Sequence, residues 1–433
     1  MIQRSQVTMS NQQDNTPGEF YSWIILGVSF LIMVVYGGVQ FSFGVFFKPL
    51  ISEFGWTRSA TSGIYSLYMI MRGVFALVLG SLSDRYGARL SLTIGSIAMG
   101  LGLLLTSRAT AIWQLYLLYS VLVGVGAGAF STTLPTAISR WFVRRRGLAL
   151  GIWSSGLGIG TLIFSPLSQF LISAYDWRSS YIILAIIAGT ITIPGALMIR
   201  DRANDTRPSR DSQKTDQGGK ATPWDYAETQ IPFRQVIRIS SFWMLITVAV
   251  IGMFITFAPI LHLVAYATDQ GISAVTAANI LAIVGVFSFI GRIVIGTASD
   301  RIEARKLIAI MYFLQGAVLL LLALQLRDVA TLYMLGAVFG FCWGGTVPLV
   351  TSLTAQYFGV YSMGATYGTL QLSGLTGSAL ASVMAGYIHD TTGTYVIAFA
   401  IFGVLGILGS ILTLLLPRSK AANPTPRNPS LTL

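Results

Sequence analysis

The chain has 433 residues, of which 54% are hydrophobic and only 10% are charged, and its mean hydropathy is +0.69. A water-soluble protein of this length needs far more charge on its surface, so the composition excludes a soluble globular fold and indicates an integral membrane protein. The net charge of +12 would suit a nucleic-acid partner. The positions of the basic residues in the loops explain this net charge by membrane topology instead.

Twelve apolar runs are long enough to cross a bilayer as helices, and they predict an all-α polytopic membrane protein. The first run is too long for the apolar core of a cleavable secretory signal, so we expect it to remain in the protein. Cys342 is the single cysteine, which excludes an intramolecular disulfide. The runs lie near residues 21–47, 59–82, 91–107, 112–139, 147–173, 180–200, 241–266, 276–298, 307–325, 329–354, 362–387 and 395–416.

The basic residues are divided unequally between the two sides of the membrane. If the N-terminus is cytoplasmic, two of the 28 Lys and Arg residues fall within runs, a few fall in outer loops, and the large majority fall on the inner side. This is the positive-inside pattern, so we predict cytoplasmic termini, a cell-membrane location and no nucleic-acid partner. The outer basic residues are Lys48, Arg58, Arg108, Arg178 and Arg327.

An internal repeat divides the chain into two pseudo-symmetric halves. The segment "GSLSDRYGARL" begins at Gly80, after the second run, and "GTASDRIEARK" begins at Gly296, after the eighth. Two six-helix halves around a central site are the plan of many secondary transporters. The charged residues of both copies are predicted to latch the halves together on the cytoplasmic side by ion pairs or helix capping. They are Asp84, Arg85, Arg89, Asp300, Arg301 and Arg305.

The repeat and the apolar runs together predict the organisation of the chain. A cytoplasmic N-terminal segment covers 1–20, the first six-helix half 21–200, a polar cytoplasmic linker 201–238, the second half 239–416 and a cytoplasmic tail 417–433.

The segment "GSLSDRYGAR" resembles the loop signature between helices two and three of the major facilitator superfamily, and the resemblance covers nearly the whole chain. A closer similarity is to bacterial relatives of monocarboxylate transporters and oxalate–formate exchangers. It rests on "FGVFFKPLISEFGWTRS", "RWFVRRRGLALGIWSSGLGIG", "HLVAYATDQGIS" and "GYIHDTTGTY". The resemblance implies the major facilitator fold, organic-anion transport and an essential arginine in helix eight, where Arg292 stands. Two positions depart from animal monocarboxylate transporters, since Ser288 replaces an aspartate and Phe41 a lysine.

Arg72 and Arg292 stand inside apolar runs, in the second and eighth helices. A charged side chain at mid-bilayer is costly, and no Asp or Glu falls in the centre of any run to compensate it. Under the repeat, Arg72 corresponds to Ser288, one helical turn before Arg292 and on the same face. We therefore expect both arginines to approach one central cavity from opposite halves. Their two alternative roles are anion binding and structural pairing with backbone carbonyls or a helix end.

Polar and aromatic residues in other helices are candidates for completing the binding site, although each could equally serve in helix packing. Amide donors suit carboxylate oxygens, and aromatic walls exclude water. His262 is the candidate for proton coupling, placed near a cavity wall of helix seven, whereas His389 is expected at the outer end and exposed to solvent. The substrate-site candidates are Tyr36, Gln40, Tyr119, Trp343, Tyr367 and Gln371.

These features favour a secondary carrier of a small organic anion, with a monocarboxylate such as lactate or pyruvate as first candidate and protons as coupling ion. A dicarboxylate or inorganic-anion exchanger is the alternative within transporters, and a substrate sensor on a transporter scaffold is the alternative of another class. No nucleophile–base pair, metal-ligand spacing or phosphate loop occurs, so we expect no enzyme, metal or cofactor. The lipid bilayer is the surrounding partner, and a functional monomer is expected.

Overall fold

The computed structural model describes residues 17–142, 146–200, 233–299, 302–325, 327–358 and 363–417. These residues are almost entirely helical and contain no strand. The elements are α1 (Pro17–Phe54), α2 (Arg58–Tyr86), α3 (Ala88–Thr106), α4 (Ile112–Leu115), η1 (Tyr116–Val123), α5 (Gly124–Trp141), α6 (Arg146–Ala174), α7 (Trp177–Met198), α8 (Phe233–Val236), α9 (Ser240–Asp269), α10 (Ala274–Ala298), α11 (Ala304–Ala323), α12 (Val329–Phe358), α13 (Met363–Thr392) and α14 (Val396–Leu415).

Twelve long helical segments run side by side in the described parts of the chain, because α4, the π-helical turn η1 and α5 follow one another without a break. Eleven of the segments are long and apolar enough to cross a membrane. The exception is α13, a 30-residue helix rich in Gly, Ser and Thr. Its composition follows from its position, because α13 packs against α9 on one side and α2 on the other and so faces protein more than lipid.

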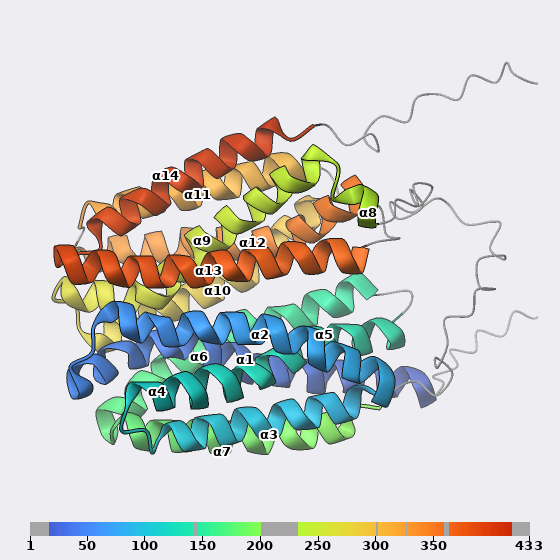
Figure 1. Ribbon diagram of the computed structural model, residues 1–433, viewed down its shortest axis with the longest axis horizontal. Helices are drawn as coiled ribbons and strands as arrows, with labels where there is room; N and C mark the ends of the chain where they lie inside the picture. Colours follow the sequence, from blue (N-terminus) through green and yellow to red (C-terminus); the bar gives the residue numbers. More distant parts are fainter. Residues whose placement is uncertain are drawn as a thin grey trace, which may run out of the picture.

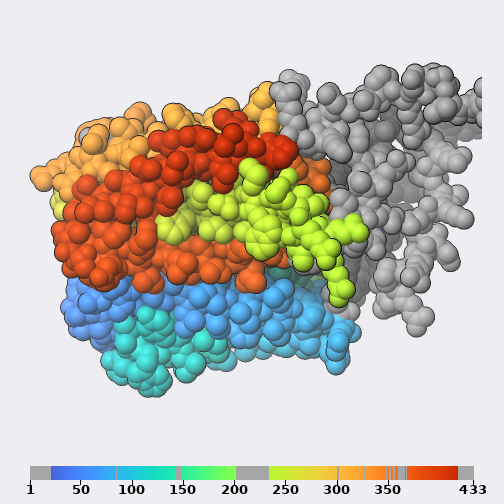
Figure 2. Space-filling model, turned by 45° about the horizontal axis from the view of Figure 1, so that its top comes forward, coloured from blue at the N-terminus to red at the C-terminus, as the bar shows by residue number. Residues whose placement is uncertain are grey.

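The helices form two halves, α1–α7 and α9–α14, which pack together through α2 with α13, α6 with α10, and α1 with α9. Figure 2 shows the orange and red C-terminal half lying directly on the blue N-terminal half. Small residues allow this approach. A Cβ atom on Gly158 of α6 would lie 2.6 Å from the carbonyl oxygen of Gly285 of α10, which is closer than any side chain tolerates.

The two ends of the bundle are distinguishable. Helix α1 begins and α14 ends at the same end, which we call the terminal end (Figure 1). A hydrogen bond from Tyr21 to the carbonyl of Met198 joins the start of α1 to the end of α7 there. The opposite end, which we call the far end, holds capped helix starts: the side chains of Thr57, Asp176 and Ser273 accept backbone N–H groups of α2, α7 and α10.

Large apolar side chains cover the outside of the bundle. Leu77 of α2, Phe170 of α6 and Leu380 of α13 are each more than 60% exposed, which would be unfavourable in water and is expected against lipid. Inside, serine and threonine hydroxyls bond to backbone carbonyls, as Ser66 does to Ala379 across the halves at 2.6 Å. The described chain is therefore built as a multi-pass membrane bundle with a polar interior seam.

Candidate functional site

A cavity with an empty volume of about 810 Å³, part of it open to solvent, lies between the two halves. Helices α1, α2, α6, α9, α10, α11, α12 and α13 all contribute to its wall. Among the described residues that line it there is no Asp or Glu. The polar side chains that line it are Gln40, Arg72, Thr256, Arg292, Tyr312, Thr346 and Gln371.

Arg292 of α10 is 7% exposed and reaches from the C-terminal half to the N-terminal half. Its Nη1 donates a hydrogen bond to the backbone carbonyl of Ser154 in α6. Its Nε and Nη2 are buried and have no hydrogen-bond partner in the described structure. These two nitrogens form one edge of the planar guanidinium, which is the edge that can hold both oxygens of a carboxylate. The geometry thus leaves a bidentate anion fork at the cavity wall.

Arg72 of α2 lines the same cavity from the other half. Its guanidinium carbon lies over the ring of Tyr36, 5.6 Å from the ring centroid, in a cation–π contact. Among the described residues no carboxylate lies within ion-pair distance of Arg72 or Arg292. The cavity is therefore electropositive on two sides.

The other sequence candidates separate into three groups. Gln40, Trp343 and Gln371 line the cavity, whereas Tyr36 is fully buried and lies beside Arg72. Tyr119 belongs to a buried aromatic cluster away from the lining, and its hydroxyl donates to the carbonyl of Val39 at 3.3 Å. The side chain of Tyr367 lies outside the described residues.

The cavity is also lined by residues that are not among the substrate-site candidates from the sequence, notably Thr256 and Phe257 of α9 and Thr346 of α12. Their signal is helical spacing: Ala249, Met253, Thr256 and Phe257 repeat at intervals of three and four residues along one face of α9. Polar residues alone do not reveal this face of α9 as part of the cavity wall, because most of its residues are apolar.

His262 does not line the cavity, contrary to the expectation from sequence. It is fully buried nearer the far end, with Nδ1 3.0 Å from the hydroxyl of Tyr395 and Nε2 3.1 Å from the carbonyl oxygen of Ser382. Because Tyr395 accepts a hydrogen bond from Arg58 at 2.8 Å, its own proton is available for Nδ1. Nε2 carries the hydrogen that the carbonyl of Ser382 accepts, and in the neutral imidazole Nδ1 accepts from Tyr395.

A group of charged residues connects the halves at the far end, and we call it the far-end ion cluster: Lys48, Arg58, Asp269, His389 and Asp390. Asp269 of α9 lies 2.6 Å from the amine of Lys48 and 2.7 Å from the guanidinium of Arg58. Asp390 of α13 accepts the backbone N–H groups of Arg58 and Ser59, each at 2.8 Å. The cluster thus fastens α1 and α2 to α9 and α13.

His389 is part of this closure, whereas the sequence suggested that it is solvent-exposed. Its side chain is 14% exposed and Nε2 lies 3.5 Å from Asp269. Helix α2 approaches α13 closely beside it. Gly386 permits this approach, since a Cβ atom there would lie 2.8 Å from the backbone of Arg58. The sequence could not show this burial, which depends on how two distant helix ends meet.

The residues predicted to latch the halves at the terminal end are only partly described. Arg85 and Arg89 are exposed, and the side chains of Asp84, Asp300 and Arg301 lie outside the described residues. Arg305 of α11 donates to the carbonyls of Leu414 and Leu416 at 3.3 and 2.5 Å. It also lies 3.0 Å from the carboxylate of Glu303. Its partners among the described residues are thus all within the C-terminal half, where it joins α11 to the end of α14, because the free carbonyls of a helix C-terminus attract a cation.

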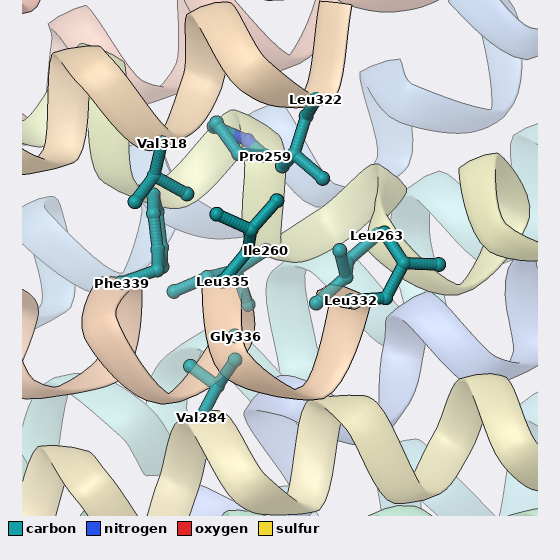
Figure 3. A pocket seen from close by; sticks show the side chains of 10 residues that line it. All are labelled: Pro259, Ile260, Leu263, Val284, Val318, Leu322, Leu332, Leu335, Gly336 and Phe339. Atoms are coloured by element: carbon teal, nitrogen blue, oxygen red, sulfur yellow. The ribbon is translucent and has the colours of Figure 1, made fainter. Parts of the chain in front are cut away.

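A second, smaller cavity lies inside the C-terminal half, between α9, α10, α11 and α12 (Figure 3). The described residues that line it are all apolar and include Pro259, Leu322 and Phe339. It offers no hydrogen-bond donor to an anion, so the cavity between the halves is the candidate site.

Comparison with known proteins gives consistent matches. The profile of the Major Facilitator Superfamily matches residues 29–374 and 280–432. Monocarboxylate transporter 13 of Rattus norvegicus is 28% identical over 403 residues, which cover 93% of this chain and 90% of the relative. Monocarboxylate transporter 12 of Mus musculus is 28% identical over 416 residues, which cover 92% and 85%.

A solved structure has the same fold. It is a bacterial homolog of the human lysosomal transporter Spinster, in an inward-facing and unoccupied conformation. The alignment has a TM-score of 0.65 and 15% sequence identity, and it covers 92% of this chain and 95% of that one.

Proposed function

The chain belongs to the major facilitator superfamily of membrane transporters, and from this premise we propose that it carries a small organic anion across the cell membrane by alternating access. A monocarboxylate such as lactate or pyruvate is the first candidate. The observation that carries the proposal is the free Nε–Nη2 edge of Arg292, buried at a cavity whose described lining contains no carboxylate. Two cations that have no counter-ion among the described residues favour an anionic ligand.

The orientation follows from the charges. The terminal end is cytoplasmic and the far end is outside, because the loops assigned to the inner side carry most of the basic residues. Both termini then lie in the cytoplasm. The transporter works as a monomer in the bilayer, since one chain provides both halves of the cavity wall.

We infer that the protein here is in a state open toward the cytoplasm. The far-end ion cluster closes one side, with Asp269 bonded to the partners from the other half. The cavity extends the other way: Ala249, Val350 and Leu370 line it, and each lies in the third of its helix nearest the terminal end. Opening the far end requires α2 and α13 to separate, which breaks the cluster and exposes the same cavity to the outside.

A panel of ligands tests the assignment of the site. Purified protein is heated with lactate, pyruvate, oxalate, succinate, sulfate, lactamide and choline. The proposal expects the unfolding temperature to rise with carboxylates and to stay unchanged with the neutral amide and the cation. Stabilisation by choline but not by any anion would contradict it.

A dicarboxylate or inorganic-anion exchanger is the second candidate, favoured by Arg72 and its lack of a described acidic partner. Arg72→Gln tests it, because the loss of Coulomb energy scales with substrate charge. If pyruvate binding weakens about threefold, succinate binding should weaken about tenfold. The measurement is the dissociation constant of each ligand, with exposed Arg108→Gln as control. Equal losses would show that Arg72 acts structurally, and the exchanger would lose its support.

Proton coupling completes the proposal, with His262 as the group that binds the proton. In the closed far end Nδ1 accepts from Tyr395 in the neutral form, so a proton can bind there only when the hydroxyl hydrogen of Tyr395 turns away from Nδ1. We expect wild type in liposomes without internal substrate to accumulate lactate under an inward proton gradient. His262→Gln should lose this accumulation and retain exchange of lactate for lactate.

Accumulation that persists in His262→Gln would remove His262 as the coupling group and leave the carboxyl group of the substrate to carry the proton. A wild type that ignores the gradient but responds to internal anion would replace symport by exchange.

A further inference from the structure

We infer that the preferred substrate is an aryl-substituted monocarboxylate, with its carboxylate on Arg292 and its ring against an aromatic wall formed by Phe41, Phe257 and Trp343. The inference rests on the proposed function and specifies the class of its substrate.

The aromatic wall is assembled from both halves. Phe41 comes from α1, Phe257 from α9 and Trp343 from α12, and all three line the cavity. The rings of Phe41 and Trp343 meet edge to face with centroids 4.9 Å apart, and those of Phe41 and Phe257 stack at 6.2 Å. Phe257 and Trp343 close the triangle at 6.4 Å. These are the separations at which aromatic pairs attract, so a further ring can be added to the wall.

The wall stands directly beside the anion fork. The guanidinium carbon of Arg292 lies 5.8 Å from the ring centroid of Trp343. The guanidinium and Trp343 therefore line the same part of the cavity, so an acid held on the Nε–Nη2 edge can carry an aryl group to the aromatic wall, as an arylacetate or an aryl-substituted oxo acid would. The face of Trp343 also keeps the guanidinium oriented, which serves binding of any carboxylate.

The remainder of the lining favours an apolar body over a short acid. Leu157, Met253, Val347 and Val350 line the cavity together with the aromatic wall. A ring on the acid removes its own apolar area from water against this surface, whereas a two- or three-carbon acid on Arg292 has little apolar area to bury. A second carboxylate would have to lie against these apolar residues unless it reached Arg72. The aromatic wall thus sets a preference that the two arginines alone do not.

The test compares matched acids on the full-length protein in lipid nanodiscs. Dissociation constants are measured by calorimetry for acetate, cyclohexylacetate and phenylacetate, and phenethylamine serves as the ring without a carboxylate. We expect phenylacetate to bind at least about tenfold more tightly than acetate, and more tightly than cyclohexylacetate because aromatic pairing adds to burial. Phenethylamine should not bind.

Variants on one helix identify the wall. Phe257→Leu keeps an apolar side chain at the cavity and should weaken phenylacetate about three- to tenfold while changing acetate little. Phe254→Leu is the matched control, because Phe254 packs against Phe402 away from the lining, and it should change neither ligand. Phe41→Leu tests the part of the wall that comes from the N-terminal half, and it should change the dissociation constants of phenylacetate and acetate as Phe257→Leu does.

The outcomes separate this inference from the proposed function. If acetate, pyruvate and lactate bind and phenylacetate binds no better, the aromatic wall only packs the halves together and the inference fails alone. Equal effects of Phe257→Leu and Phe254→Leu would overturn it in the same way. If none of these carboxylates binds, the proposed function fails first.

Discussion

Replacing Arg292 by lysine should reduce transport of a carboxylate at least about thirtyfold, although the positive charge is retained. Lysine is a point charge on a flexible stem and cannot present two parallel N–H groups to the two carboxylate oxygens. Removing one partner of a buried, hydrogen-bonded charge pair costs about 2–5 kcal/mol, and about 2 kcal/mol already corresponds to a thirtyfold loss. The measurement is the initial rate of radiolabelled uptake into liposomes, normalised to the amount of inserted protein.

The control is Arg108→Lys, an exposed arginine at the far end that does not line the cavity. It should transport at the wild-type rate. Insertion and monodispersity of Arg292→Lys are checked first, because Nη1 also bonds to Ser154 across the halves. A well-folded Arg292→Lys protein with the wild-type rate would show that the arginine holds the helices together and does not bind cargo.

Replacing Asp269 by asparagine should open the far end. Asp269 bridges Lys48, Arg58 and His389, so the neutral isostere removes the charge that holds both halves. The carboxylate is about one-quarter exposed, and solvent screening limits the expected shift to about 1.4 kcal/mol, a tenfold change in the equilibrium between closed and open states.

The measurement uses Ser66→Cys, a position buried between α2 and α13 where the serine hydroxyl bonds to Ala379. A membrane-impermeant thiol reagent added from outside should label this cysteine about tenfold faster in the Asp269→Asn background. Asp328→Asn is the charge-matched control, because Asp328 bonds to Thr331 of its own helix. Equal labelling rates in all three proteins would show that the far-end ion cluster does not control access.

The sequence is sufficient to predict the helices, because each apolar run is a local signal. It also predicts that Arg72 and Arg292 line one cavity, because the repeated motif relates the second helix of one half to the second helix of the other. It did not predict the aromatic wall. Trp343 is a substrate-site candidate from the sequence, whereas Phe41 and Phe257 are ordinary core residues when each helix is considered alone, and only the relative rotation of three helices brings the three rings together.

The histidines illustrate the same limit. The sequence places His262 and His389 only by their depth along one helix, whereas their surroundings come from Arg58 of α2 and Tyr395 at the start of α14. Contacts between helix ends that are far apart in sequence leave no periodic signal. Helix α13 is a local signal that only the structure explains: it is weakly apolar because α2 and α9 cover much of its surface.

Flux through the purified protein tests the central claim most directly. The full chain is reconstituted into liposomes loaded with unlabelled pyruvate, and entry of radiolabelled pyruvate is followed over time for wild type, Arg292→Lys and protein-free liposomes. The account predicts rapid entry in wild type that exceeds equilibrium transiently and entry at the protein-free level in Arg292→Lys. Binding of pyruvate with no flux in wild type would indicate a sensor, and equal flux in wild type and Arg292→Lys would contradict the carboxylate site.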